Sequence, residues 1–561
     1  MRKILPLCIV IAAGLAGCAS QEAAPRPDTQ QTSQAQSFGD YLAARLAASD
    51  HDIVDAARLY NQSLASDPGN ADILSHAFLY TAASGDVAKA AELAGQLVKT
   101  DPNNRAAQLA LAVEAMKTGN YAGARADLTS PAKGPITGLT MVVLDAWAAA
   151  GTGDLKAAEA DLGQVVAQGG TETLADFHRA LIEDLAGQDK VAESAYRSAT
   201  SSGGQSPRVA EAYGRFLERD AKADEARAYY TKLKTDLALG PIATEGLARI
   251  AAGKKPDRLI SSPAAGAAEA LFGIAASLTE ENSADVAVLY LRLALYLAPD
   301  LDLAKIVLAD RFEALGKYKD AIAVYDALGT GSTYRPAAEV QVALDKTRLG
   351  HDDQAVSQLL TLTHQDPKDL TAWTALGDAY RDQEKYTEAA QAYDHAVALL
   401  GSDKNTAWPL YYARGIAEER SHHWDAAEGD LKHALQLSPE QPQVLNYLGY
   451  SWVDQGRHLP EALAMLEKAR SLSPFDGYVV DSVGWAYYRL GRYPDAVKAL
   501  ENAIQLVPGD ATVNEHLGDA YWKIGRKLDA RFQWSHALAF GPDPTTKAEL
   551  EKKLASAAAT K

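Results

Sequence analysis

The chain has 561 residues, 47% of them hydrophobic with alanine the commonest, and a formal net charge of −18. This length exceeds what one hydrophobic core serves, so several domains or an array of repeats is expected. The acidic excess, with no block of Lys and Arg residues, argues against a nucleic-acid partner.

The opening stretch, MRKILPLCIVIAAGLAGC, has a basic start, a short apolar run and then small residues, which is typical of a secretory signal. The run is shorter than the roughly 20 residues that a membrane-spanning helix needs. Its end, Leu15-Ala16-Gly17-Cys18, closely resembles the lipobox of bacterial lipoproteins. The resemblance implies that residues 1–17 are removed and that the Cys18 thiol receives a diacylglycerol anchor. An ordinary cleaved signal that happens to end in Cys is the alternative.

Residues 18–36 are rich in Gln, Ala, Ser and Pro and poor in large apolar groups, so we expect a lipidated, flexible tether. Ala19 and Ser20 stand where, by resemblance to enterobacterial lipoproteins, an Asp would retain the protein in the inner membrane. We therefore expect an anchor in the outer membrane of a Gram-negative bacterium, facing the periplasm. The only other Cys, Cys8, lies in the removed segment, so the mature chain cannot form an internal disulfide.

Prolines recur at a nearly constant interval in the remainder of the chain. The steps between Pro439, Pro474, Pro508 and Pro542 are 35, 34 and 34 residues. A 34-residue period is the signature of tetratricopeptide repeats (TPRs), each of which is a pair of antiparallel helices, A and B. The predicted fold is therefore an all-α TPR solenoid, a right-handed superhelix of about 14 repeats in two segments.

The two predicted segments differ in how well they match the repeat. Residues 37–250 hold about six divergent repeats, and residues 267–544 hold eight. Between them, residues 251–266 contain two Pro and two adjacent Lys, which break the helical pattern and predict a linker or seam. Residues 545–561 are expected to form a capping helix and tail.

The repeat consensus is clearest near the C-terminus, where one repeat supplies Val483, Gly484, Tyr487, Ala496 and Leu500. Gly484, at the eighth position, and Ala496, at the twentieth, are expected where helices A and B touch, because only a small group fits there.

Aromatic and hydrogen-bonding residues are predicted on the inner surface of the superhelix, on the side of helix A that lines it in this family. Seven of the eight Trp and 17 of the 25 Tyr lie after residue 266. A concave wall of this kind suits an extended peptide or a partner's helix. The alternative is that the rings fill a well-packed core and the wall binds nothing specific. The predicted wall consists of Asn446, Tyr450, Asp481, Trp485, Tyr488, Arg489, Glu515, Asp519 and Trp522.

Motifs that carry catalysis are missing from the sequence. It contains no GxxxxGK[ST] loop, GxGxxG fingerprint, HExxH zinc helix or GxSxG elbow. His422 and His423 are adjacent, so they point to different sides of a helix and make a poor metal pair. We therefore expect no enzyme, no metal site and no cofactor.

Residues 445–496 resemble the C-terminal repeats of the lipoprotein adaptor that partners a periplasmic carboxyl-terminal processing protease. The mature chain as a whole resembles TPR lipoproteins of Gram-negative bacteria. The resemblance implies a non-catalytic adaptor, anchored to the outer membrane, that holds this serine protease and presents substrates to it. Two alternatives remain: an assembly lipoprotein of a secretion, pilus or polysaccharide-export machine, and a cell-wall enzyme with an unrecognised site.

Overall fold

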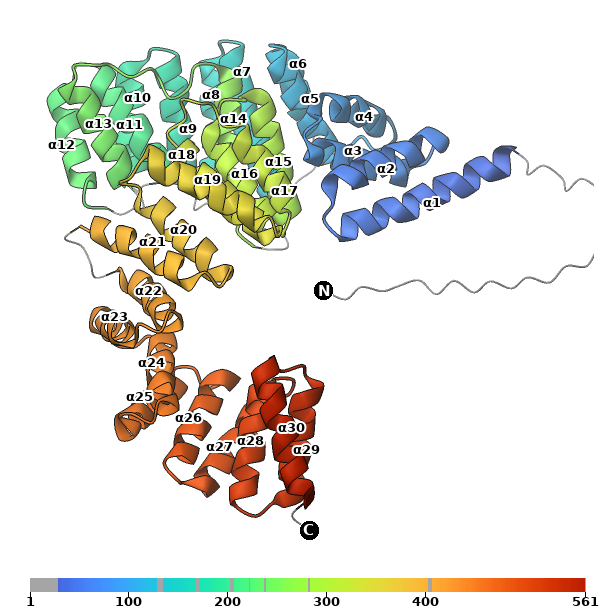
Figure 1. Ribbon diagram of the computed structural model, residues 1–561. Coiled ribbons are helices and arrows are strands. Elements are labelled where there is room, and N and C mark those ends of the chain that lie inside the picture. Colours follow the sequence, from blue (N-terminus) through green and yellow to red (C-terminus); the bar gives the residue numbers. More distant parts are fainter. Residues whose placement is uncertain are drawn as a thin grey trace, which may run out of the picture. The chain divides into compact units, whose positions relative to one another are not determined.

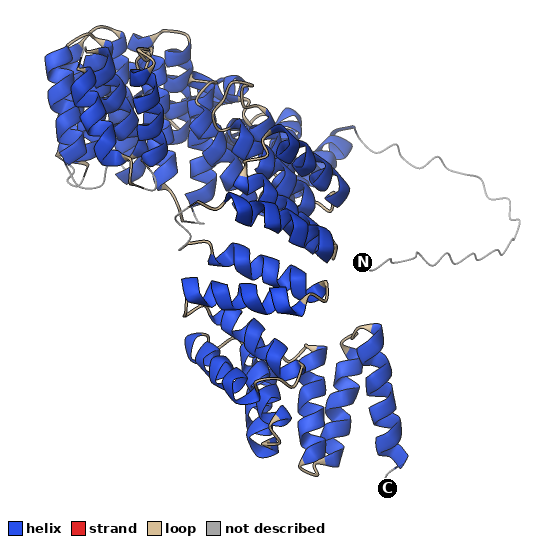
Figure 2. Ribbon diagram, turned by 60° about the vertical axis from the view of Figure 1, so that its left-hand side comes forward, coloured by secondary structure: helices blue, strands red, loops and turns tan. Residues whose placement is uncertain are grey.

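A computed structural model describes residues 29–128, 135–167, 171–201, 206–220, 222–236, 239–280, 283–401 and 406–559. Within these ranges the secondary structure is helical and includes no strand (Figure 2). The helices fall into two compact units, Met1–Leu328 and Gly329–Lys561. The predicted signal peptide and Cys18 lie outside the described residues. Helix α1 begins at Thr29, two residues after the last Pro of the predicted tether, so the end of that segment is helical.

The described residues of the first unit form seventeen α-helices, α1 to α17 (Figure 1). Their bounds are α1 Thr29–Ser49, α2 Ile53–Ser66, α3 Ala71–Ser84, α4 Val87–Thr100, α5 Arg105–Lys117, α6 Tyr121–Leu128, α7 Pro135–Gly151, α8 Leu155–Val166, α9 Glu172–Leu185, α10 Asp189–Ser201, α11 Pro207–Arg219, α12 Ala223–Leu233, α13 Gly240–Ala251, α14 Pro263–Ser277, α15 Ala284–Leu297, α16 Asp302–Ala314 and α17 Tyr318–Asp326.

Thirteen α-helices lie in the part of the second unit that the structure describes. Their bounds are α18 Arg335–Arg348, α19 Asp352–Gln365, α20 Leu370–Asp382, α21 Tyr386–Leu399, α22 Trp408–Arg420, α23 Trp424–Leu437, α24 Pro442–Asp454, α25 Leu459–Leu472, α26 Gly477–Arg489, α27 Tyr493–Leu506, α28 Ala511–Lys523, α29 Lys527–Ala539 and α30 Pro544–Ala559.

Consecutive helices pack in pairs, as the 34-residue period predicts. Six pairs run from α1 to α12, and eight run from α14 to α29. Helix α13 belongs to none of these pairs and packs on α11 and α12, and α30 packs on α29 as a cap. The all-α TPR solenoid and its repeat number are thereby confirmed.

Local sequence sets the helix ends. At the start of α28, the Asp510 side chain accepts the Val513 N–H at 3.0 Å. After the end of α26, Gly491 lies in the left-handed region with a φ of 76°.

Small residues let the two helices of each C-terminal repeat approach closely, although the contact differs from the predicted one. A Cβ added to Gly484 would lie 2.6 Å from Cγ of Leu500, a large side chain of helix B. Gly377 faces Tyr393 and Gly518 faces Trp534 in the same way. The glycine thus makes room for the large residue sixteen positions later, rather than only for the Ala at position twenty.

In the first unit, helices α14 and α15 fold back onto earlier helices of the chain (Figure 1). Helix α14 packs on α5, α7 and α9, and α15 packs on α3, α4 and α5. Apart from α4, these are the A helices of their pairs. The Arg292 Nε–H donates to the Ala83 carbonyl at 3.1 Å, and the Tyr296 hydroxyl donates to Glu114 at 2.6 Å. A face that TPR solenoids leave open is therefore filled by the chain itself.

The closest approach in this docked pair involves a glycine on α14. A Cβ added to Gly266 would lie 2.3 Å from the ring of Trp147, which is fully buried on α7. The Trp147 Nε1–H donates to His178 Nδ1 on α9 at 3.1 Å. Gly266 therefore allows α14 to lie directly against the indole.

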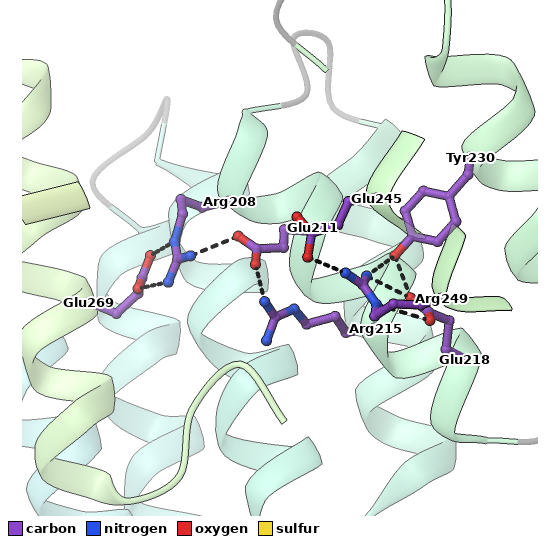
Figure 3. Close-up of polar contacts among 8 residues, drawn as sticks. All are labelled: Arg208, Glu211, Arg215, Glu218, Tyr230, Glu245, Arg249 and Glu269. Carbon is purple, nitrogen blue, oxygen red and sulfur yellow. Dashed lines mark hydrogen bonds and ion pairs between the residues drawn. The ribbon is translucent and has the colours of Figure 1, made fainter. Parts of the chain in front are cut away.

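Ion pairs along α11 tie together three helices of the first unit (Figure 3). Arg208 binds Glu269 of α14 through two hydrogen bonds, of 2.8 and 2.5 Å, and also binds Glu211 at 2.8 Å. At the other end of α11, Glu218 accepts from Tyr230 at 2.8 Å and from Arg249 of α13 at 2.9 Å. Alternating charges on one helix face thus hold α13 and α14 on either side of α11.

The main division of the fold differs from the predicted seam. Residues 252–262 do connect two helices, but the helices after them pack back on α3 to α9, so they belong to the first unit. Arg258 of this connection binds the buried Asp184 at 3.1 Å. The two compact units divide instead after Leu328.

Candidate functional site

The predicted wall residues lie on the A helices α24, α26 and α28 of the second unit. The repeat period is 35 residues from α24 to α26 and 34 residues from α26 to α28. Asn446, Asp481 and Glu515 therefore occupy equivalent positions in the three helices. Tyr450, Trp485 and Asp519 occupy the position one turn later. The structure therefore keeps the register that the sequence predicts.

Three of the nine predicted residues, Asn446, Tyr450 and Asp481, line one groove. The groove has a volume of about 400 Å³ and is formed by α22, α24, α26 and the start of α28. Its remaining wall includes the carboxylates of Glu419, Asp454 and Asp510, together with Arg420 and aromatic rings such as that of Tyr478. We call this the α22–α28 groove; it is large enough for several side chains of an extended peptide.

Trp485 and Tyr488 form a stack beside the groove. Their rings lie 4.6 Å apart at an angle of 7°, and the other face of Trp485 covers His516 at 4.0 Å and 10°. Both aromatic residues are half-buried, and each packs against a hydrophobic cluster of the core. The sequence left two alternatives for these rings, an exposed binding surface or a packed core. Each ring is partly exposed and also packs on the core, so both alternatives apply in part.

Beneath the indole of Trp485, Asp481 and His516 form a buried pair. The His516 Nδ1 lies 3.0 Å from both carboxylate oxygens of Asp481. Burial lowers the pKa of His516, but the charge and hydrogen bond of Asp481, aided by Glu515 and Asp519, outweigh it and raise the pKa above 6.5. Sequence reasoning missed His516, although it stands one repeat after Ser482 on the face toward the preceding helix.

The remaining wall residues on α28 are engaged by the last two helices. Lys553 of α30 binds Glu515 at 2.7 Å and Asp519 at 2.8 Å. Trp534 of α29 donates its Nε1–H to Asp519 at 2.9 Å. Trp522 packs against Trp534 at 5.3 Å, and the Lys527 ammonium lies 3.3 Å from the centre of its ring.

The prediction of one continuous open wall is therefore corrected. Arg489 donates to the Asp454 carbonyl at 3.0 Å and so joins two A helices. Glu515, Asp519 and Trp522 are held by cationic and indole groups of α29 and α30, because α29 packs on α28 and the Lys553 side chain of the cap reaches α28. The sequence predicted a capping helix, but no repeat position indicated where Lys553 would reach. The open part of the wall is the α22–α28 groove.

The described residues hold no cluster of three or more His, Cys, Asp or Glu side chains arranged to bind a metal ion. Over the same part of the chain, every helix is too short or too polar to cross a membrane.

Family models for the tetratricopeptide repeat match four stretches of the chain, residues 78–130, 343–404, 412–477 and 484–525. TPR repeat-containing protein PA4667 of Pseudomonas aeruginosa is 27% identical over 173 residues, which are 31% of this chain and 28% of that protein. Cytochrome c-type biogenesis protein CycH of Rhizobium meliloti is 32% identical over 111 residues, 20% of this chain and 28% of its own length.

Among solved structures, a chain of the APC/C hetero-tetramer Cut9–Hcn1 is similar in fold; the match covers 94% of the present chain and 99% of the matched chain. The identity is 16% and the TM-score is 0.39, so this likeness bears on neither function nor partner. The family models thus show tetratricopeptide repeats in these four stretches, and helix pairs of the same all-α architecture continue between them.

Proposed function

We propose that this protein is a non-catalytic adaptor that binds a protein partner in the α22–α28 groove. TPR proteins bind protein partners in general, and the groove is the observation that carries the proposal here. It lies on rigid A helices whose side chains stand in a fixed register, and it combines aromatic rings with polar groups, as peptide-binding surfaces do.

The finer proposal rests on sequence resemblance. The similarity of residues 445–496 to a protease adaptor supports a periplasmic carboxyl-terminal processing protease as the partner. The lipobox at Cys18 supports an anchor in the outer membrane. An adaptor of this kind raises the effective concentration of substrate near the protease, because both are held on one scaffold.

Affinity capture from detergent-solubilised bacterial envelopes tests this proposal. The lipidated protein is compared with a Thr512→Trp variant, in which an indole added at an exposed position of the groove fills it. We expect the wild type to recover a serine protease of this class and the variant to lose it. Repeated recovery of no protease contradicts the protease adaptor, and recovery of an outer-membrane barrel instead supports the assembly function.

A further inference from the structure

We propose that the α22–α28 groove recognises a partner segment that carries Lys or Arg side chains, and that it rejects acidic segments and free C-terminal carboxylates. This inference rests on the proposed function and specifies the chemistry of the partner. It is carried by the charge and hydrogen-bonding groups that the groove presents.

Four carboxylates, those of Glu419, Asp454, Asp481 and Asp510, line the groove against a single guanidinium, that of Arg420. Arg420 lies 3.8 Å from Glu419, so the charge of its guanidinium is partly balanced within the groove. The carboxylate of Asp481 is paired with His516, and the carboxylate of Asp510 accepts the Val513 N–H. A carboxylate brought by a partner would meet net repulsion, whereas a cation would find complementary charge.

Asp454 is the carboxylate best placed to receive that cation. It is exposed, and its side chain has no ion pair or hydrogen bond with the described part of the chain. Only its backbone carbonyl is engaged, by Arg489 at 3.0 Å. An Arg or Lys of the partner could therefore pair with Asp454 without displacing an existing bond.

The hydrogen-bonding groups of the groove point the same way. The Asn446 Oδ1 is a buried acceptor that no donor of the described residues reaches. Burial and then the charges of Asp481, Asp454 and Glu515 raise the pKa of Tyr450, which places its phenol in a negative environment. A buried acceptor without a donor is costly, so an occupant that brings N–H donors is favoured over one that brings more acceptors.

Aromatic rings complete the match to a basic side chain. Tyr447, Tyr450 and Tyr478 all line the groove. The long aliphatic stems of Lys and Arg pack well on such rings, and their charged heads interact favourably with the ring faces.

An array of random twelve-residue peptides, made with free and with amidated C-termini, tests the inference. The array is probed with the full mature chain and with the Thr512→Trp variant, whose folding is checked by circular dichroism. Peptides lost with Thr512→Trp are those that occupy the groove. We expect these peptides to be enriched in Lys and Arg and to bind equally well when amidated.

Charge reversal then locates the contact. Asp454→Lys is expected to weaken the enriched peptides roughly tenfold, because it replaces attraction by repulsion. The matched control, Asp353→Lys at an exposed site on α19, makes the same change of net charge outside the groove and is expected to leave affinity almost unchanged.

Two outcomes overturn the inference in distinguishable ways. If the peptides lost with Thr512→Trp are acidic or need a free carboxylate, the groove binds partners but the proposed chemistry is wrong. If no peptide is lost with Thr512→Trp, the groove is not a binding site. This result would contradict both the proposed function and the inference.

Discussion

Gly484 shows how much one residue decides in the packing of a repeat. A leucine at this position would drive its Cβ to within 2.6 Å of Leu500. We expect Gly484→Leu to lower the free energy of unfolding by about 2–3 kcal/mol, since overfilled contacts force backbone shifts. Urea denaturation followed by circular dichroism measures the change. Gly429→Leu is the control, because that glycine on α23 has open space around it; equal losses in both variants would contradict the packing argument.

His178 predicts how acid affects the first unit. Burial lowers its pKa to about 3, and its Nδ1 accepts the Trp147 N–H. Between pH 6.5 and 3 the unfolded chain binds a proton that the folded chain does not, so stability falls as the pH falls. We expect a loss of about 2 kcal/mol at pH 5. Thermal melting from pH 7 to 5 measures it, and His178→Gln, which keeps an acceptor, should flatten the pH dependence; an equally steep profile in the variant would exclude His178 as its source.

His516 predicts the opposite response in the second unit. Its pKa is raised above 6.5, so the folded state holds a proton that the unfolded state releases. The stability from the Asp481 pair is fully present below pH 6.5 and is lost as the pH rises through the folded pKa. We expect the melting temperature of the second unit to fall as the pH rises above 6.5, and the fall to be smaller in His516→Gln. The exposed His423 gives the control, since His423→Gln should keep the full pH dependence.

At the scale of helices, the docking of α14 depends on the absence of a side chain. Gly266 lies against the Trp147 ring, whereas Gly273 on the same helix has nothing within 4 Å of an added Cβ. We expect Gly266→Val to loosen α14 from α7 and α9, and to loosen its partner α15 with it. Hydrogen exchange read out by mass spectrometry should then show faster exchange in residues 263–297, and Gly273→Val should show no such change. Unchanged exchange in Gly266→Val would mean that the close contact does not hold the helices in place.

The helices of the C-terminal repeats could be predicted from sequence because local signals agree with the period. Residues such as Gly484 and Leu500 recur at fixed positions, and the proline steps fix the register. The return of α14 onto α7 could not be predicted in this way. Trp147 and Gly266 belong to no common repeat, and their contact depends on how the intervening helices curve.

The candidate site was predicted in the same uneven manner. Periodicity placed Asn446, Tyr450 and Asp481 on one face, and the structure groups them in one groove. The periodicity of the sequence could not reveal that Lys553 of the cap would bind Glu515 and Asp519, because a capping helix follows no repeat consensus. Nor could it reveal that Trp485 would cover a buried ion pair.

At the scale of the whole molecule, the chain divides into two units that each have their own core. A chain limited to residues 329–561 retains α18 to α30 and the hydrophobic clusters around Leu448 and Leu517. We expect this fragment to fold alone, since nearest-neighbour contacts supply the stability of repeat proteins. Circular dichroism and a cooperative melt test this expectation, and a fragment that lacks helical signal would contradict it.

The folding back of α14 and α15 bears on how the gene can change in length. Because α14 and α15 together contact helices from α3 to α9, an extra repeat inserted between α3 and α9 would separate the helices that α14 and α15 must contact at once. Duplication of a repeat is therefore disfavoured in the first unit. In the described part of the second unit, α18 to α30 pack on helices near them in the chain, so gain or loss of a repeat there alters the array without breaking a distant contact.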